Sequence, residues 1–305
     1  MRLVHDPAEP LALDDDLLVH GDNARVLELL PRGALDLVYV DPPFNTGAPR
    51  RGGRVRSVRD DAAPAGFGGR GYRRERIAGS SYDDAFEDYV GWLVPRLAAA
   101  HALLAEHGTL YVHLDQREVH YVKVALDAAL GRERFLGEVI WAYDYGGRPR
   151  DRWAPKHDTI LVYAAEAGRQ LFNKDEIDRV PYLAPGLVGA EKAARGKVPT
   201  DVHWQTIVPT GGRERTGYPT QKPEGLLRRF VQASSRPGGW CLDCFAGSGT
   251  LGAVASALGR RYVLVDSSAE AIAVAERRLA GAHAGEDPAT LLAEFRREVV
   301  PPDGV

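Results

Sequence analysis

The residues Asp41-Pro42-Pro43-Phe44 place a carboxylate, two rigid rings and an aromatic ring at the end of an apolar run. An exocyclic amine of a nucleobase has its lone pair delocalised into the ring, so its methylation requires acceptors that draw the nitrogen toward sp3 geometry. Asp41 and the Pro42 carbonyl can accept two N–H bonds, and Phe44 can stack on a base turned out of its duplex. The motif predicts chemistry on such an amine; the alternative is a simple strand-terminating turn.

A second motif, in residues 243–250, places a glycine-rich turn between an apolar run and a helical pattern. Glycine lets the backbone approach a ligand closely, and a carboxylate that ends the next strand can accept both hydroxyls of a ribose. The residues predicted to bind a nucleotide-like cofactor are Asp243, Phe245, Ala246, Gly247, Ser248, Gly249, Thr250 and Asp266. The spacing of Gly247, Gly249 and Gly252 also suits a nicotinamide dinucleotide, and a glycine turn without a ligand is a further alternative.

Strand and helix patterns alternate along the chain and must position these motifs. Apolar, β-rich runs predict strands at 17–20, 35–40, 109–114, 138–143, 159–163, 240–243 and 262–265. Amphipathic spacing predicts helices that begin at 23 and that cover 86–104, 119–130, 223–235, 250–258 and 269–279. This alternation predicts an α/β fold with a mainly parallel sheet. Ligands gather at the carboxyl ends of such strands, where Asp22, Asp41 and Asp115 are expected.

The composition is that of a globular protein, with 305 residues, 44% hydrophobic content and a formal net charge of −3. No apolar run approaches the roughly 20 residues that span a bilayer, so we expect a cytoplasmic protein without membrane contact. The two cysteines, Cys241 and Cys244, exclude a disulfide framework and are expected to pack as small apolar residues. The histidines show no metal-ligand spacing, so no metal is expected.

Two stretches interrupt the alternation. Residues 50–76 hold nine arginines against three acids, within an Arg-rich segment, 48–80, that we expect to be a mobile loop. Because it follows Phe44, this loop could contact DNA phosphates at the mouth of a site; a solvated insertion and an RGG-like contact with single strands are alternatives. The second stretch, 165–216, is polar and irregular and is interpreted as an inserted lobe.

Three motifs in one order carry a resemblance to a known family. Asp41-Pro42-Pro43-Phe44, then Pro219-Thr220-Gln221-Lys222-Pro223, then the turn at 243–250, is similar to the β class of amino-methylating DNA methyltransferases. The resemblance implies a Rossmann-like class I methyltransferase fold with permuted motif order and a small inserted target-recognition lobe. It also implies S-adenosylmethionine as the cofactor.

The resemblance assigns roles to particular residues. Asp41, Pro42, Pro43 and Phe44 would be catalytic, as the counterpart of the family's D-P-P-Y/F motif. Asp22, in the short motif Gly21-Asp22-Asn23, would lie beside the adenine of the cofactor, and Thr220 and Lys222 would help close its pocket. The implied organisation is an N-terminal catalytic part at 1–164, a target-recognition region at 165–216, a cofactor-binding part at 217–281 and a tail at 282–305.

The implied reaction is methylation of adenine N6 in a short sequence of double-stranded DNA, with base flipping. Cytosine N4 is the alternative target, although relatives acting on it more often begin the motif with serine. An NAD-dependent oxidoreductase and a non-catalytic nucleic-acid-binding protein are the competing classes. The predicted DNA contacts are Arg50, Arg51, Arg54, Arg73, Arg74, Arg148 and Arg213. A homodimer and a cognate restriction endonuclease are partners that the resemblance leaves open.

Overall fold

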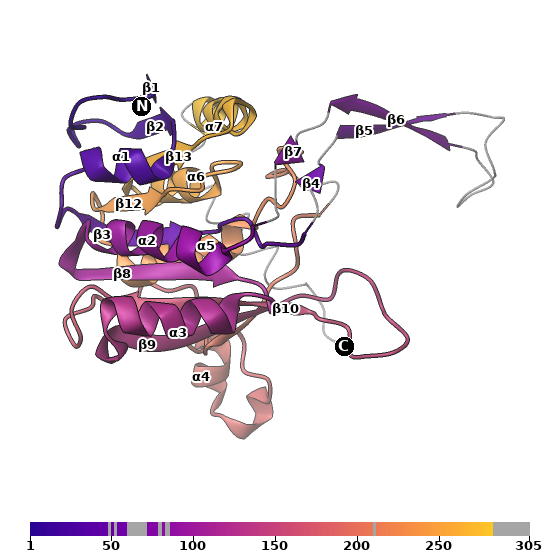
Figure 1. Cartoon of the computed structure of the whole chain (residues 1–305). Helices are drawn as coiled ribbons and strands as arrows, with labels where there is room; N and C mark the ends of the chain where they lie inside the picture. Colours follow the sequence, from indigo (N-terminus) through magenta and orange to yellow (C-terminus); the bar gives the residue numbers. More distant parts are fainter. Residues whose placement is uncertain are drawn as a thin grey trace.

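One central sheet organises the protein, as the computed structural model in Figure 1 shows. The structure describes residues 1–47, 50–51, 54–59, 72–78, 81–82, 86–209 and 212–282. Within these ranges the sheet has nine strands, which in spatial order are β1 (Arg2–His5), β2 (Leu17–His20), β13 (Arg261–Asp266), β12 (Trp240–Asp243), β3 (Leu35–Val40), β8 (Leu104–Leu114), β10 (His157–Ala164), β9 (Phe135–Ala142) and β11 (Val202–Trp204).

The strands from β1 to β8 in this order run parallel to one another. β10 is antiparallel to both β8 and β9, because the chain passes from β9 to β10 through a loop and not through a crossover helix. The expected mainly parallel α/β sheet is therefore confirmed. β3 and β12, which carry the two motifs, are neighbours with Leu37 opposite Cys241, so both motifs leave the sheet at one edge.

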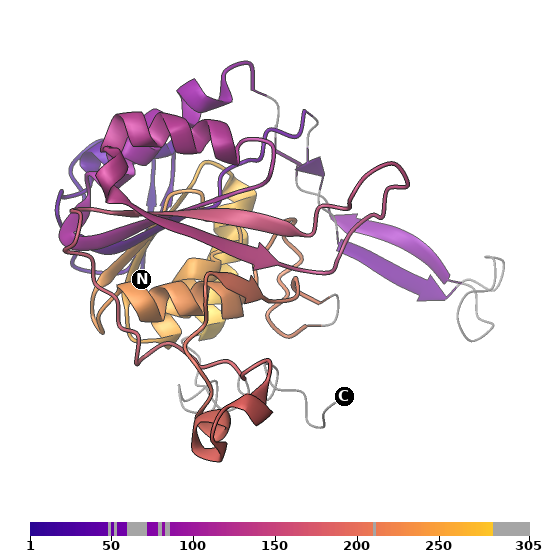
Figure 2. The ribbon, with the colours of Figure 1, turned by 90° about the horizontal axis from the view of Figure 1, so that it is seen from below.

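Helices cover both faces of the sheet. On one face α1 (Asn23–Leu29), α2 (Tyr89–His101) and α3 (Val119–Leu130) pack against one apolar core. On the other face α5 (Glu224–Ser234), α6 (Thr250–Ala257) and α7 (Ala269–Ala282) pack against a second core. Figure 2 shows the same layers from below. The result is the three-layer, Rossmann-like arrangement that the motif order implied.

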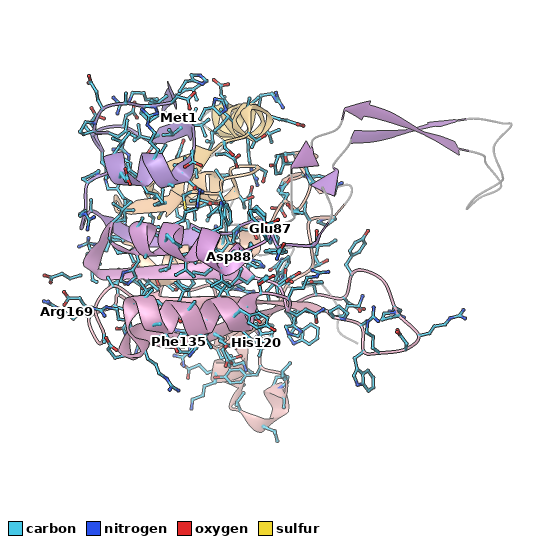
Figure 3. The ribbon with its side chains drawn as sticks, in the orientation of Figure 1. Met1, Glu87, Asp88, His120, Phe135 and Arg169 are labelled. Carbon is cyan, nitrogen blue, oxygen red and sulfur yellow. The ribbon has the colours of Figure 1, made fainter. Side chains whose placement is uncertain are left out.

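Element boundaries differ from the sequence patterns where side-chain caps decide them. The helix expected at 86–104 begins at Tyr89, because the Asp88 carboxylate accepts a hydrogen bond from the Gly91 amide at 2.8 Å. Figure 3 shows Glu87 and Asp88 at this end of the helix. β8 begins at Leu104, five residues before the predicted start at 109, and β1 is a strand without a prediction.

The Arg-rich segment forms strands where it is described, so the expected loop is wrong there. β5 (Arg54–Arg59) pairs with β6 (Tyr72–Ala78) in an antiparallel ribbon, and β4 (Arg50–Arg51) pairs with β7 (Ser81–Tyr82). Valine, tyrosine and isoleucine occur among these arginines and have high β propensity. A count of charges does not detect that preference. Figures 1 and 2 show the β5–β6 ribbon extending away from the sheet. The other residues of 48–80 lie outside the described ranges.

The predicted inserted lobe is joined to the main sheet. Its strand β11 pairs with β9, and it also contains the short helix α4 (Ala190–Arg195). Residues 283–305 of the expected tail lie outside the described ranges. Within the described ranges, no helix has the length and apolar character to cross a membrane.

Candidate active site

A cavity of about 320 Å3 opens where β3 and β12 end side by side. It brings together residues that the sequence places far apart. The predicted site residues that line it are Asp22, Asp41, Pro42, Pro43, Phe44, Thr220, Lys222, Asp243, Phe245, Ala246, Gly247, Ser248, Thr250 and Asp266. Both motifs and the segment before α5 therefore share one cavity; of the predicted catalytic and cofactor-binding residues, Gly249 alone does not line it.

The two carboxylate oxygens of Asp41 have different surroundings. Its Oδ2 accepts a hydrogen bond from the Lys222 ammonium, and the two side chains form an ion pair. Its Oδ1 is buried and has no hydrogen-bond partner within the described ranges. A buried acceptor without a partner is costly, so it is suited to receive an N–H donor from a ligand in the cavity.

The rest of the Asp-Pro-Pro-Phe motif is held by neighbouring aromatic groups. The Tyr89 hydroxyl donates to the Pro43 carbonyl at 2.5 Å. The Phe44 ring lies 5.0 Å from the Lys222 ammonium and 5.9 Å from the ring of His113. Since Lys222 contacts both Asp41 and Phe44, it holds the carboxylate and the aromatic ring in fixed positions relative to each other.

A buried polar chain lies behind the motif and was missed by the sequence reasoning. The Tyr39 hydroxyl pairs with His113 Nδ1 at 2.8 Å, and His113 Nε2 pairs with Asp158 at 3.1 Å. The Tyr143 hydroxyl also donates to Asp158. Burial raises the pKa of Tyr39 well above its usual value, so its hydroxyl stays protonated. The available signal was a tyrosine and a histidine within otherwise apolar strands.

The glycines of the turn are required for packing as well as for room beside a ligand. Gly247 and Gly249 have φ values of +48° and +72°, a region that glycine adopts readily. A Cβ atom on Gly249 would lie 2.9 Å from Cβ of Ala275 in α7, and one on Gly252 would lie 2.7 Å from the Leu264 side chain. The last two glycines therefore permit close packing of α6, which explains why Gly249 does not line the cavity.

Two carboxyl groups flank the turn. Asp266 accepts hydrogen bonds from the amides of Gly247 and Ser268, both at 2.8 Å, and its oxygens retain lone pairs for ribose hydroxyls. Burial raises the pKa of Asp266. Asp243 is buried beneath the turn and accepts from the Phe245 amide at 2.9 Å. Burial raises the pKa of Asp243 well above its usual value, which favours its protonated form beside Asp41.

At the far end of the cavity, Arg96 organises the Asp22 region. Its Nε donates to Asn23 Oδ1 at 2.9 Å, and its guanidinium lies 3.6 Å from the Asp22 carboxylate and 4.7 Å from the Trp92 ring centroid. Asp22 also caps α1 by accepting from the Ala24 amide. Arg96 and Trp92 were not predicted; their four-residue spacing on one helix face was the available signal.

Other predicted residues lie outside the cavity. Asp115 follows β8 as expected, but its carboxylate pairs with Arg117 and does not line the cavity. Arg148 and Arg213 are exposed and also do not line it. Arg50, Arg51, Arg54, Arg73 and Arg74 lie in the strands that follow Phe44. Cys241 and Cys244 are free and buried as expected, and burial raises the pKa of the Cys241 thiol to about 12.

Comparison with known proteins identifies the family. A family model described as DNA methylase, of the N6/N4 methyltransferase type, matches residues 35–277. The chain belongs to this DNA methylase family. It is 27% identical to the DNA adenine methyltransferase YhdJ of Escherichia coli, over 86% of this chain and 82% of that protein. It is 29% identical to the type II methyltransferase M.HpaI of Haemophilus parainfluenzae, over 87% of this chain and 74% of that protein.

Solved structures share the fold of this DNA methylase. The PvuII cytosine-N4-specific DNA methyltransferase superposes with a TM-score of 0.58 at 15% identity, covering 92% of this chain and 91% of that one. TTHA0409 of Thermus thermophilus, in complex with S-adenosylmethionine, superposes with a TM-score of 0.56 at 18% identity, covering 94% of this chain and 96% of that one. The predicted class I methyltransferase fold is confirmed.

Membership of this family also confirms the predicted enzyme class and cofactor. The enzyme class, a DNA methyltransferase, and the S-adenosylmethionine cofactor are those that the motif order implied. The family match does not support an NAD-dependent oxidoreductase, the class that the three-glycine spacing left open.

Proposed function

We propose that this chain transfers a methyl group from S-adenosylmethionine to adenine N6 within a short sequence of double-stranded DNA. The observation that carries the proposal is the buried Oδ1 of Asp41, which has no hydrogen-bond partner in the described part of the chain and lies in a cavity shared with the glycine turn. The adenine-specific relative YhdJ and the aspartate that begins the motif support adenine over cytosine.

The cofactor fits the end of the cavity formed by the glycine turn. Asp266, with lone pairs free beyond its two amide contacts, would hold the ribose, and Asp22 with Arg96 would lie beside the adenine. Gly247 lines the cavity without a side chain, which leaves room for the ligand. When bound, S-adenosylmethionine supplies an electrophilic methyl group on a sulfonium.

The residues of the Asp-Pro-Pro-Phe motif act on the target amine. Asp41 Oδ1 accepts one N–H, and the Pro42 carbonyl accepts the other, which draws the nitrogen toward sp3 geometry. Lys222 holds the Asp41 carboxylate in place through Oδ2. Phe44 stacks on the flipped base. These contacts fix the amine, so alignment supplies much of the rate without a covalent enzyme intermediate.

DNA would approach the edge of the sheet where β3 and β8 end. The β9–β10 loop lies at this edge, because β10 begins opposite the end of β8. The loop exposes Arg148 and the rings of Tyr145 and Trp153. The β5–β6 ribbon supplies arginines on the same side of the molecule (Figure 1). Arginines here would contact phosphates and stabilise the strand from which the base is turned.

Different segments of the chain would carry out catalysis and target recognition. Residues 1–164 and 217–281 would form the catalytic domain, and residues 165–216 would read the target sequence. Arg213 lies in that region and would contact DNA. The protein would act in the cytoplasm; a homodimer and a cognate restriction endonuclease are the partners to test.

Sequencing of genomic DNA tests the function directly. DNA from methylation-free cells that express this chain is compared, by single-molecule sequencing, with DNA from cells that express Asp41→Ala. We expect N6-methyladenine at one short motif, absent with Asp41→Ala and present with Asp14→Ala, which changes an exposed aspartate far from the cavity. Calorimetric titration of S-adenosylmethionine into purified Asp41→Ala shows whether the variant is folded. N4-methylcytosine, or no modification from soluble protein, would overturn the proposal.

A further inference from the structure

A second cavity, of about 390 Å3, lies on the α5 face of the sheet. Its walls come from the second half of α5, from β8 and β9, and from the residues around β11. It shares no lining residue with the first cavity. The volume falls in the lower part of the range of roughly 300–1,000 Å3 typical of small-molecule sites.

Several polar groups on the walls are incompletely paired within the described part of the chain. The buried atoms Thr109 Oγ1, Gln170 Oε1 and His203 Nδ1 have no hydrogen-bond partner there. Arg229 is only 7% exposed and its guanidinium forms no hydrogen bond or ion pair with the described residues, although the charge of Asp178 opposes the lowering of its pKa by burial. Its neighbour Arg228, by contrast, pairs with Asp178 at 2.6 Å. The Thr109 hydroxyl and the Arg229 guanidinium are hydrogen-bond donors, and incompletely paired donors on one cavity indicate an acceptor group on a ligand.

The charge of these groups selects the ligand. Burial and the nearby charge of Arg229 lower the pKa of His203 to about 4, so His203 is neutral near neutral pH. Arg229 therefore contributes a single buried positive charge. Glu138 and Asp201 are exposed lining residues and place negative charge at the edge of the cavity. This balance favours a monoanion over a dianion such as phosphate.

The remaining walls are apolar and aromatic. The Phe230 ring is nearly parallel to two neighbouring rings, with centroid distances of 4.7 Å to Tyr111 and 5.9 Å to His203. Val139, Val162 and Ile177 complete the apolar surface. A ligand with a flat or aliphatic body would bury apolar surface here, while its charged end reaches Arg229.

From these contacts we infer that the second cavity binds a small apolar or aromatic monocarboxylate. Its carboxylate pairs with Arg229 and accepts from the Thr109 hydroxyl, and its body lies against Phe230. A guanidinium matches a carboxylate in planar, two-point geometry, which a lysine at the same place would not provide. The ligand would be distinct from both S-adenosylmethionine and DNA.

Fluorine NMR with para-fluorophenylacetate tests this site on the full-length protein. The neutral para-fluorophenylacetamide has a similar shape and is the matched control probe. Two variants report on different walls: Arg229→Gln removes the charge, and Ala233→Leu fills space beside Ser234 without altering a charge. The midpoint of thermal unfolding and S-adenosylmethionine binding show that each variant is folded.

We expect saturable binding of the carboxylate, about tenfold tighter than that of the amide, with about tenfold loss in either variant. Saturating S-adenosylmethionine should leave the binding unchanged. Absence of saturable binding, equal affinity for the two probes, full binding by Ala233→Leu, or displacement by S-adenosylmethionine would each overturn the inference. If Arg229→Gln does not fold, the comparison of the two probes and Ala233→Leu still decide.

Discussion

Lys222 and Asp41 are 181 residues apart in the chain and form an ion pair in the lining of the first cavity. The pair joins the segment before α5 to the end of β3. Lys222 is 8% exposed and Asp41 17%, so both charges are largely removed from water and depend on each other. The Pro-Thr-Gln-Lys-Pro segment thus contributes to the catalytic motif as well as to the cofactor pocket.

A double-mutant cycle should show strong coupling across this pair. Lys222→Met leaves the Asp41 carboxylate without its cation, so we expect a loss of about 3 kcal/mol in the free energy of unfolding. Asp41→Asn combined with Lys222→Met should recover much of that stability, because no unpaired charge remains. Urea unfolding of the four proteins measures the coupling. Strictly additive losses would show that the two side chains act independently.

Arg96 should affect cofactor affinity more than turnover. Arg96→Gln removes the contacts with Asp22, Asn23 and Trp92, so we expect S-adenosylmethionine to bind about tenfold more weakly, with kcat at saturation changed by less than about twofold. Calorimetric titration and steady-state kinetics measure the two quantities. Arg25→Gln is the matched control, since Arg25 is exposed on α1. A fall in kcat at unchanged affinity would place Arg96 in the chemical step.

His203 should make stability depend on pH in the mildly acidic range. Its pKa of about 4 in the folded protein lies below the usual histidine value of 6.5, so the unfolded chain takes up the proton first as the pH falls. The contribution of neutral His203 to the free energy of unfolding is therefore fully present above about pH 6.5. It is lost, by up to about 3 kcal/mol, as the pH decreases to about 4.

The variant His203→Gln isolates this contribution. Urea unfolding of the wild type and the variant at several pH values should give curves that diverge across this window, with the wild type losing more stability on acidification. Parallel pH profiles for the two proteins would contradict the assignment.

The β5–β6 ribbon should contribute to DNA affinity through charge. Replacement of residues 54–78 by a short Gly-Ser linker should weaken DNA binding and reduce the slope of log Kd against log salt by about 2 to 4, at close to one per lost phosphate contact. Fluorescence anisotropy across a salt series measures this slope. Arg132→Ala, at an exposed arginine before β9 and away from the proposed DNA edge, is the control. An unchanged slope would mean that the ribbon does not meet phosphates.

The sequence predicted the elements with strong local signals. The strands that end at Val40 and Asp243 are short, apolar and followed by residues that stop a strand, so pattern alone located both motifs. The shared cavity follows from a general rule, because adjacent parallel strands deliver their carboxyl ends to one edge of the sheet.

Contacts between distant segments could not be predicted in the same way. The chain from Tyr39 to His113 and Asp158 depends on the register of three strands, which no local pattern encodes. Asp115 shared the local signal of Asp41, yet Arg117, two residues later, pairs with its carboxylate outside the cavity. In the Arg-rich segment, net charge suggested a loop, while the β-branched and aromatic residues among the arginines favoured strands.

The adjacency of β3 and β12 has a consequence for synthesis of the protein. The two strands are separated by about 200 residues, which a ribosome adds in roughly 10 to 40 s at about 5–20 residues per second. During that interval β3 can pair with β8, but its other edge has no partner. An apolar edge left open in this way is a site for misassociation, so the growing chain needs protection until its last third emerges. The nascent enzyme is therefore inactive, and at its most aggregation-prone, until β12 is inserted.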